Sequence, residues 1–500
     1  MSTKPSENNP ADSSSARTLL NEAISAHEAG DVERAAGLYR NILIRNPNDA
    51  DALNLLGAAQ LQLGKPHEAI ELINKAISAY PGMASFHFNL ASSYVAADDP
   101  QTAIYHFRKA IQIDPAHINA HIKLAELLQQ QGDLDGVIAH YSRVLGYQPD
   151  NVEILTNLGN IYSQLKKMDE AEKCYRQAVT LRPDFVEAIN NLGNVYFDQD
   201  RVDEAIELYR ETIAKDPDFA PAHYNLGSAF LKQKDRDAAA AEFLENVRLE
   251  NDNPRAHRHL AEIYHFKGDI TQAIAHYKEV LRLEPENVEV LNALGLSLLQ
   301  NENNEEANRF FEKALSIDPH HAYTLNNYGN ALCRQGKVSV SIEYFRKALD
   351  VDPNLAEAHC NLGNALKESD EIEAAIDHYR SALSLKPDFA MAHMNLGNAY
   401  KDSGDFSAAY GRYEAATLIN PRAAEAHLNK GIILLLLGRF AEAWKEYEWR
   451  LEMLAKRPDC RKFLKPRWDG SPLNGRRILV HAEQDRHRRF WGALRDAQEI

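Results

Sequence analysis

Asparagines that recur at a fixed spacing are the residues of this 500-residue chain with the clearest capacity for recognition chemistry. One row comprises Asn21, Asn89, Asn157, Asn191, Asn225, Asn327, Asn361, Asn395 and Asn429. A second row follows three residues later in five places, as Asn160, Asn194, Asn330, Asn364 and Asn398. A carboxamide carries both a hydrogen-bond donor and an acceptor, which suits the main chain of an extended peptide whatever its side chains. We therefore predict that these rows form a peptide-binding surface.

An alternative role for the asparagines stays open at this stage. Residues three apart share one face of a helix, so each doublet would present two amides side by side. Asparagine is a mediocre helix former, and its recurrence at one helical position therefore needs a reason. Hydrogen bonds between adjacent repeats, or the copying of one ancestral unit, would also account for the rows.

Prolines mark a 34-residue period that places the asparagine rows on one repeated structural unit. They are Pro47, Pro81, Pro115, Pro149, Pro183, Pro217, Pro285, Pro319, Pro353, Pro387 and Pro421, and Asn251 occupies the one slot that lacks proline. A glycine or alanine recurs in the first half of each unit and an aromatic residue in the second half, as at Gly193 and Tyr209. The chain is therefore a repeat array.

Each unit predicts a helical hairpin. In residues 186–219, apolar residues recur at helical spacing from Ile189 to Tyr196, and a second helical run ends before Pro217. Proline stops that helix because it cannot donate the next backbone hydrogen bond. One hairpin cannot bury its apolar face alone, so neighbouring units must stack. The pattern predicts an all-α, right-handed superhelix of about thirteen hairpins over residues 16–457, with an inner groove lined by the first helices.

Composition and charge exclude several classes of function. The net charge is −16, and because residues 456–500 contribute +6, the preceding 455 residues carry −22. Phosphate contact requires a basic face, so we expect no nucleic-acid partner. The four cysteines lack the spacing of a disulfide framework or a zinc site, as is typical of a cytoplasmic protein. No apolar run reaches the ~18 residues of a membrane span.

The small, alanine, aromatic and proline positions together resemble the tetratricopeptide repeat (TPR). The asparagine rows are similar to those in the TPR domain of the O-linked N-acetylglucosamine transferase family, whose units read Asn-Leu-Gly-Asn at this place. That resemblance implies that Asn157, Asn191, Asn225, Asn327, Asn361, Asn395 and Asn429 run along an inner groove and hold the main chain of protein substrates. The row lapses at His259 and Ala293, which interrupts a single continuous track.

The sequence changes character near its C-terminal end. Residues 458–475 read as a turn-rich linker, and the run Arg476–His481 reads as the first strand of an α/β domain. With the Trp468-Asp469-Gly470 turn, this segment resembles bacterial TPR proteins that continue into a Rossmann-like glycosyltransferase domain. We expect residues 476–500 to be only a truncated start of such a domain, and residues 1–15 to be a disordered lead-in.

The sequence thus predicts a protein-interaction scaffold that binds extended peptides or partner proteins in its groove, with no membrane partner and no metal. The alternative is the substrate-recruiting arm of a protein O-GlcNAc-type or bacterial glycosyltransferase whose catalytic domain this chain lacks. No catalytic residues are identified, so catalysis by the chain is not expected. No cofactor is expected either, since a nucleotide-sugar donor would require the full transferase domain.

Overall fold

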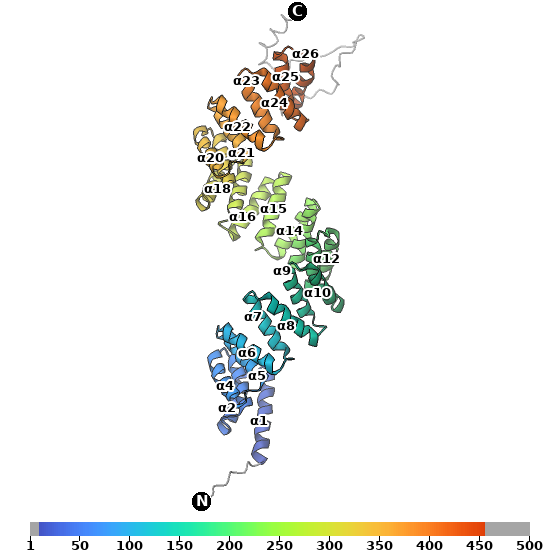
Figure 1. Cartoon of the computed structure of the whole chain (residues 1–500), viewed down its shortest axis with the longest axis vertical. Helices are drawn as coiled ribbons and strands as arrows, with labels where there is room; N and C mark the ends of the chain where they lie inside the picture. The colour runs from blue at the N-terminus through green and yellow to red at the C-terminus, as the bar shows by residue number, and fades with distance from the viewer. Residues whose placement is uncertain (1–9, 456–500) are drawn as a thin grey trace, which may run out of the picture. The chain divides into compact units, whose positions relative to one another are not determined.

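The computed structural model describes residues 10–455, in which all regular structure is α-helical (Figure 1). The linker predicted at 458–475 and the α/β fragment predicted at 476–500 lie outside the described residues. Two compact units divide the chain, Met1–Asn301 and Glu302–Ile500, and each is treated separately below.

The helices of the first unit alternate between first and second members of the predicted hairpins. They are α1 (Pro10–Glu28), α2 (Val32–Arg45), α3 (Ala50–Gln62), α4 (Pro66–Ala79), α5 (Ala84–Ala96), α6 (Pro100–Ile113), α7 (Ile118–Gln130), α8 (Leu134–Tyr147), α9 (Val152–Gln164), α10 (Met168–Leu181), α11 (Val186–Asp198), α12 (Val202–Lys215), α13 (Ala220–Lys232), α14 (Arg236–Leu249), α15 (Pro254–Lys267), α16 (Ile270–Leu283) and α17 (Val288–Gln300).

The second unit continues the same alternation. Its helices are α18 (Asn304–Ile317), α19 (Ala322–Arg334), α20 (Val338–Val351), α21 (Ala356–Glu368), α22 (Ile372–Leu385), α23 (Ala390–Asp402), α24 (Phe406–Ile419), α25 (Ala424–Leu436), α26 (Phe440–Tyr447) and α27 (Arg450–Ala455). Within each unit, consecutive helices pack against each other, except that α27 packs against α25. The 34-residue period and the stacked hairpins predicted from the sequence are confirmed by these elements.

The two ends of the array differ from the regular pattern. Helix α1 begins at Pro10, inside the segment 1–15 that the sequence predicts to be disordered. A proline in the first turn costs no helical hydrogen bond, because that N–H would have no partner in any case. At the other end, α26 stops at Tyr447 after only eight residues. A Cβ on Gly431 would lie 2.8 Å from the backbone N of Tyr447, so the main chains of α25 and α26 approach closely there.

The repeated proline acts through the residue that precedes it. Asn46 and Asp216 leave the helical region, with φ/ψ of −131/88° and −136/94°, as the ring of a following proline requires. Glu250 adopts −135/84° although Asn251 follows it. The turn there is supported instead by buried Asn246, whose Oδ1 accepts from Nδ2 of Asn253 at 2.9 Å. The missing proline is thus a local substitution and not a boundary.

The repeated small residue of each first helix accommodates the aromatic ring of the same hairpin. A Cβ built on Gly193 or Gly363 would lie 2.6 or 2.7 Å from a ring carbon of Tyr209 or Tyr379, closer than carbon atoms pack. Both rings are fully buried. The sequence places the aromatic residue between neighbouring units, whereas its closest constraint lies within its own unit.

Replacing Gly363 with alanine should lower the free energy of unfolding by about 1–3 kcal/mol, because the methyl group overpacks the Tyr379 ring. Guanidinium unfolding followed by circular dichroism measures the change. Gly146→Ala is the matched control, since nothing lies within 4 Å of its added Cβ in α8. Equal stability of the two variants would contradict the packing argument.

The turn between the two helices of a hairpin requires a left-handed backbone at one position. Glycine occupies it at Gly64, Gly132, Gly268, Gly336 and Gly404, with φ between 73 and 85°. Lys166 and Lys234 occupy it elsewhere, with φ of 58 and 65°. Residues with a Cβ adopt this region at a cost that glycine does not incur.

Lys166→Gly should therefore stabilise the protein by about 0.5–1 kcal/mol. Thermal and guanidinium unfolding both measure this change. Gly132→Ala should act in the opposite direction, because its added Cβ has nothing within 4 Å and the effect would come from φ alone. Stabilisation by both substitutions would be inconsistent with a left-handed constraint.

Candidate functional site

The first helices of consecutive hairpins lie closer to each other than the second helices do. The first helices also carry both asparagine rows. Helices α9, α11 and α13 contact one another in sequence in the first unit, and α19, α21 and α23 do so in the second. Among the described helices, no two second helices of consecutive hairpins contact each other to that extent. The first helices therefore form the inner layer of each unit.

The structure brings the predicted residues together as one surface in each unit, here called the asparagine face. In the first unit it comprises Asn157, Asn160, Asn191, Asn194 and Asn225, and in the second Asn327, Asn330, Asn361, Asn364, Asn395, Asn398 and Asn429. Asn157 and Asn160 are exposed, and the other ten side chains are half-buried. The amides are thus accessible to solvent, while most of them are also partly covered by neighbouring residues.

Amide hydrogen bonds link consecutive repeats along this face. Three run from Nδ2 of Asn89, Asn225 and Asn361 to Oδ1 of Asn54, Asn190 and Asn326, at 3.0, 2.9 and 3.0 Å. Three others run from Nδ2 of Asn191, Asn395 and Asn429 to Oδ1 of Asn160, Asn364 and Asn398, at 3.0, 2.8 and 3.3 Å. The first-row asparagines therefore do bridge adjacent repeats.

Three asparagines that the sequence analysis missed decide which kind of bridge forms. Asn54, Asn190 and Asn326 are buried and accept the first-row amide of the next repeat. Where the equivalent residue is Thr156, Cys360 or Met394, the amide turns to the second-row asparagine instead. The adjacent pairs Asn190-Asn191 and Asn326-Asn327 were the available signal in the sequence.

Tyrosine hydroxyls hold the second-row asparagines in place. Tyr379 donates to Oδ1 of Asn364 at 2.7 Å, and Tyr413 donates to Oδ1 of Asn398 at 2.6 Å. Tyr175 and Tyr209 do the same for Asn160 and Asn194. Burial raises the pKa of Tyr175 to about 12, so its hydroxyl stays protonated and donates at neutral pH.

The bridging bonds leave a donor and an acceptor unused at two steps of the second unit, Asn364–Asn395 and Asn398–Asn429. Oδ1 of Asn364 accepts from both Tyr379 and Asn395, so its Nδ2 has no partner among the described residues. Asn395 uses its Nδ2 toward Asn364 and, at 3.7 Å, toward Sγ of Cys360, which leaves its Oδ1 unused. Asn398 and Asn429 repeat this arrangement one hairpin later.

A hollow of about 620 Å³ lies over these unused groups. Asn364, Asn395, Asn398 and Tyr379 line it, together with Lys367, Glu368, Asp370, Ile372 and Asp402. An ion pair of 2.9 Å between Lys367 and Asp402 joins α21 to α23 beside the amides. The hollow therefore offers paired amide groups with charges of both signs at its edge.

The asparagine face is interrupted in the first unit, as the sequence predicts. His259 takes the first-row position in α15, and its ring stacks on Phe243 with centroids 4.9 Å apart. Glu262 takes the second-row position and forms an ion pair with Arg258 at 3.0 Å. Side chains that carry charge thus replace neutral amides at this hairpin.

The recurring histidines hold the turns between consecutive hairpins. Nε2 of His87, His121, His223, His257, His359, His393 and His427 lies 3.0–3.3 Å from the carbonyl oxygen of the residue six positions earlier, and can donate to it. The Nδ1 atoms of four of them face a second histidine, as in His87–His106 at 3.1 Å. Between residues 10 and 455, no three metal-ligating side chains converge.

Acid should destabilise the array through the second members of these histidine pairs. Burial, with the charge of the partner histidine, lowers the pKa of His106, His140 and His276 from 6.5 to about 4. The unfolded chain binds more protons than the folded chain between these values, so stability is complete above pH ~6.5 and falls as the pH drops toward 4.

Proton uptake on unfolding, obtained from the pH dependence of guanidinium unfolding between pH 7 and 5, measures this effect. The double variant His106→Gln/His140→Gln should flatten that dependence, whereas His67→Gln, at an exposed histidine, should not. An unchanged slope in the double variant would exclude the histidine pairs as its source.

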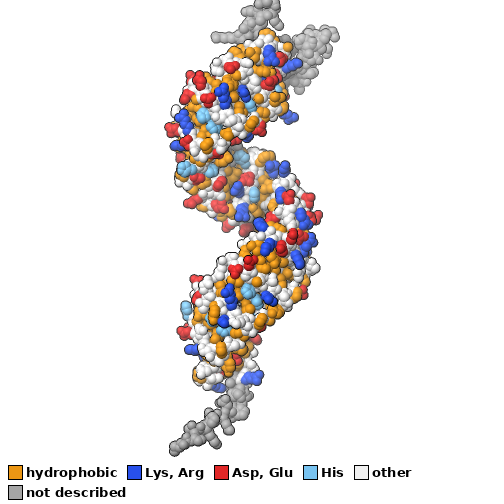
Figure 2. All heavy atoms as spheres, viewed as in Figure 1, with side chains coloured by type: hydrophobic (Ala, Val, Ile, Leu, Met, Phe, Trp, Pro, Cys, Tyr) orange, Lys and Arg blue, Asp and Glu red, His pale blue; other side chains and the backbone are white. Residues whose placement is uncertain are grey.

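Charges of both signs lie on the surface of each unit. Acidic and basic side chains are interspersed on the face of each unit that Figure 2 shows, without a continuous basic stripe. None of the helices between residues 10 and 455 has the length and apolar character that a membrane crossing requires.

Comparison with known proteins identifies the repeat. Models of tetratricopeptide repeats match residues 20–84 and 394–448, 94–139, 127–166 and 152–185. A model described as the cilia and flagella-associated protein 70 C-terminal domain matches residues 184–386. A search of curated proteins finds no match.

Three solved structures illustrate the similarity of the chain to known proteins. One is a chain of the APC/C hetero-tetramer Cut9-Hcn1, with 14% identity over 84% of this chain and 96% of that chain and a TM-score of 0.44. Another is YrrB, described as a TPR protein with an unusual peptide-binding site, with 20% identity over 37% and 95% of the two chains and a TM-score of 0.33. MamA has 30% identity over 33% and 95%, with a TM-score of 0.30. With its hairpin period, its glycine–aromatic contacts and the matching repeat models, the chain is a tetratricopeptide-repeat protein.

Proposed function

We propose that this protein is an interaction scaffold whose asparagine face binds an extended segment of another protein. The observation that carries the proposal is the unused amide pair at two consecutive steps of the second unit, Asn364–Asn395 and Asn398–Asn429. Nδ2 of Asn364 can donate to a peptide carbonyl, and Oδ1 of Asn395 can accept from a peptide N–H. Such contacts read the main chain and tolerate many sequences.

Inter-repeat bonding supports this function and does not compete with it. The hydroxyl of Tyr379 and the amide of Asn395 fix the orientation of the Asn364 side chain before any peptide arrives. A side chain that is already ordered loses less conformational entropy on binding. Each exposed amide contact contributes about 0.5–1.5 kcal/mol net, so several contacts together suit an affinity in the micromolar range.

The described cysteines favour a reducing compartment such as the cytoplasm. Cys174, Cys333 and Cys360 are all unpaired thiols. Burial raises the pKa of Cys174 and Cys360 to about 11, which keeps both protonated and unreactive at neutral pH. Nucleic acid is a poor partner for a surface of mixed charge, so we propose proteins as the partners.

The alternative role, recruitment of protein substrates to a glycosyltransferase, would use the same asparagine face. It differs from the scaffold role in residues 476–500, which lie outside the described structure. The glycosyltransferase role, which rests on a resemblance of the sequence, therefore stays a prediction.

Exchanging Asn364 and Asn398 for aspartate tests the proposal while it preserves the bridges. Aspartate keeps an oxygen that accepts from Tyr379 and Asn395, and it replaces only the unused Nδ2 donor. A peptide selected from a displayed random library against the wild-type array should bind the double variant about tenfold more weakly, by fluorescence anisotropy.

Asn354→Asp is the matched control, because it adds the same charge at an exposed turn outside the asparagine face. It should leave the affinity unchanged. Undiminished binding by a correctly folded Asn364→Asp/Asn398→Asp array would remove the asparagine face as the binding surface.

A further inference from the structure

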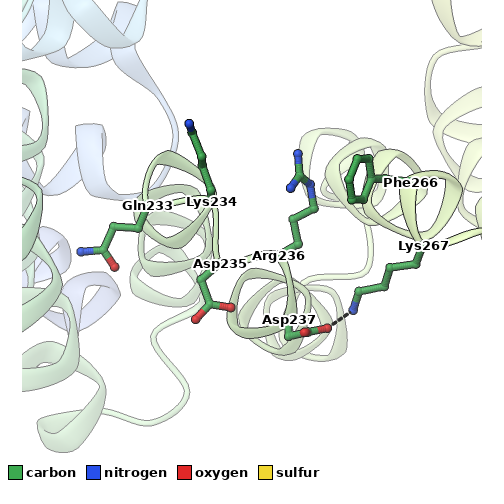
Figure 3. A pocket seen from close by; sticks show the side chains of 7 residues that line it. All are labelled: Gln233, Lys234, Asp235, Arg236, Asp237, Phe266 and Lys267. Carbon is green, nitrogen blue, oxygen red and sulfur yellow. Dashed lines mark ion pairs between the residues drawn. The ribbon is translucent and has the colours of Figure 1, made fainter. Parts of the chain in front are cut away.

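A second hollow, of about 470 Å³, lies in the first unit and is independent of the bridged amides (Figure 3). It is formed by the turn between α13 and α14 and by the C-terminal end of α15. Lys234 and Asp235 come from the turn, Arg236 and Asp237 come from the first turn of α14, and Phe266 comes from α15. None of these residues belongs to the asparagine rows.

Charges of opposite sign are separated within this hollow. Figure 3 shows the side chains of Lys234 and Arg236 pointing to one side, with Arg236 beside Phe266, and those of Asp235 and Asp237 pointing to the other. The carboxylates are already engaged: Asp235 accepts from the backbone N of Ala238 at 3.0 Å, and Asp237 forms an ion pair with Lys267. The two cations therefore face solvent without a neutralising carboxylate from the same turn.

Arg236 is oriented by an aromatic ring but has no acceptor. Its guanidinium carbon lies 3.8 Å from the centroid of the Phe266 ring, and its side chain is half-buried. No hydrogen bond or ion pair of its guanidinium is formed with the described residues. A guanidinium stacked on a ring keeps its N–H edge free, and that edge matches the two oxygens of a carboxylate.

Lys234 adds a second cation at the left-handed position of the turn. Six of the thirteen such positions among the described residues carry a residue other than glycine, and Lys234 is one of them, with φ of 65°. Its Nζ forms no ion pair among the described residues, whereas Lys166, at the equivalent turn of another hairpin, pairs with Asp198 at 3.9 Å. The ammonium group of Lys234 is therefore available to a partner.

Phe266 supplies an apolar surface next to the cations. It is 68% exposed, which is unusual for a phenylalanine of a stacked array. It lies seven residues after His259 and four after Glu262, on the same face of α15. The hollow therefore lies at the end of the face that elsewhere carries the asparagines.

We propose that this hollow is a separate docking site for an acidic segment of a partner protein. A glutamate or aspartate carboxylate would accept from the N–H edge of Arg236 and pair with Nζ of Lys234, and a neighbouring apolar side chain would cover Phe266. An acidic segment is the occupant because its carboxylates complement the two cations, and because the ring-stacked guanidinium of Arg236 has no acceptor among the described residues. The site extends recognition beyond the main-chain contacts of the asparagine face and does not depend on them.

The test uses the full chain and a short fluorescein-labelled peptide in which a phenylalanine lies between glutamates. Fluorescence anisotropy in low-salt buffer should show binding that weakens about tenfold in Arg236→Gln and when glutamine replaces the glutamates of the peptide. Phe266→Ala should weaken binding, and Phe266→Tyr should restore it. Binding should also weaken with added salt, less steeply in Lys234→Gln.

Matched controls separate this site from general charge effects. Arg255→Gln removes a cation at the other end of α15, and Lys166→Gln removes the lysine of an equivalent turn; both should bind as wild type does. Circular dichroism and thermal unfolding verify the fold of each variant.

Wild-type affinity in folded Arg236→Gln and Phe266→Ala would overturn the proposal, as would equal binding of the glutamine peptide. A phosphoserine peptide that bound more than about tenfold tighter would overturn the assignment of a carboxylate as the occupant.

Discussion

The contact between a buried tyrosine ring and the Cα of a glycine in the same hairpin is the constraint on which the asparagine face depends. Gly363 and Gly397 lack the Cβ that would collide with Tyr379 and Tyr413. The rings can therefore reach across the hairpin and place their hydroxyls on Asn364 and Asn398. Close packing inside the hairpin thus fixes the orientation of a polar side chain on its surface.

Bridging and binding, which the sequence offered as alternatives, are compatible in this geometry. A carboxamide has four hydrogen-bonding positions, and the bridges of the second unit use Oδ1 of one asparagine and Nδ2 of the next. The groups that stay unused are Nδ2 of the first asparagine and Oδ1 of the next, which are one donor and one acceptor on consecutive first helices. A structural ladder and a recognition surface can therefore be built from the same residues.

The sequence predicted the fold well because its repeat marks have direct steric causes. Proline fixes the residue before it, and glycine admits the ring, so both are visible as single positions in each unit. It predicted the asparagine positions as well, but not their bonding, since the bridges depend on whether Asn190 or Thr156 occupies a buried site on the neighbouring helix. It did not predict the left-handed turns at Lys166 and Lys234, because lysine stands there in place of the glycine that marks this turn in other hairpins.

Departures from the repeat carry information that the repeat itself does not. Every hairpin must satisfy the same packing, so residues shared by all hairpins mainly report on that packing. Phe266 departs from it by exposing an aromatic ring. This departure does not improve the stability of its hairpin. The ring stacks on the guanidinium of Arg236, which has no acceptor among the described residues, and recognition of another molecule is the role that we propose for the two side chains.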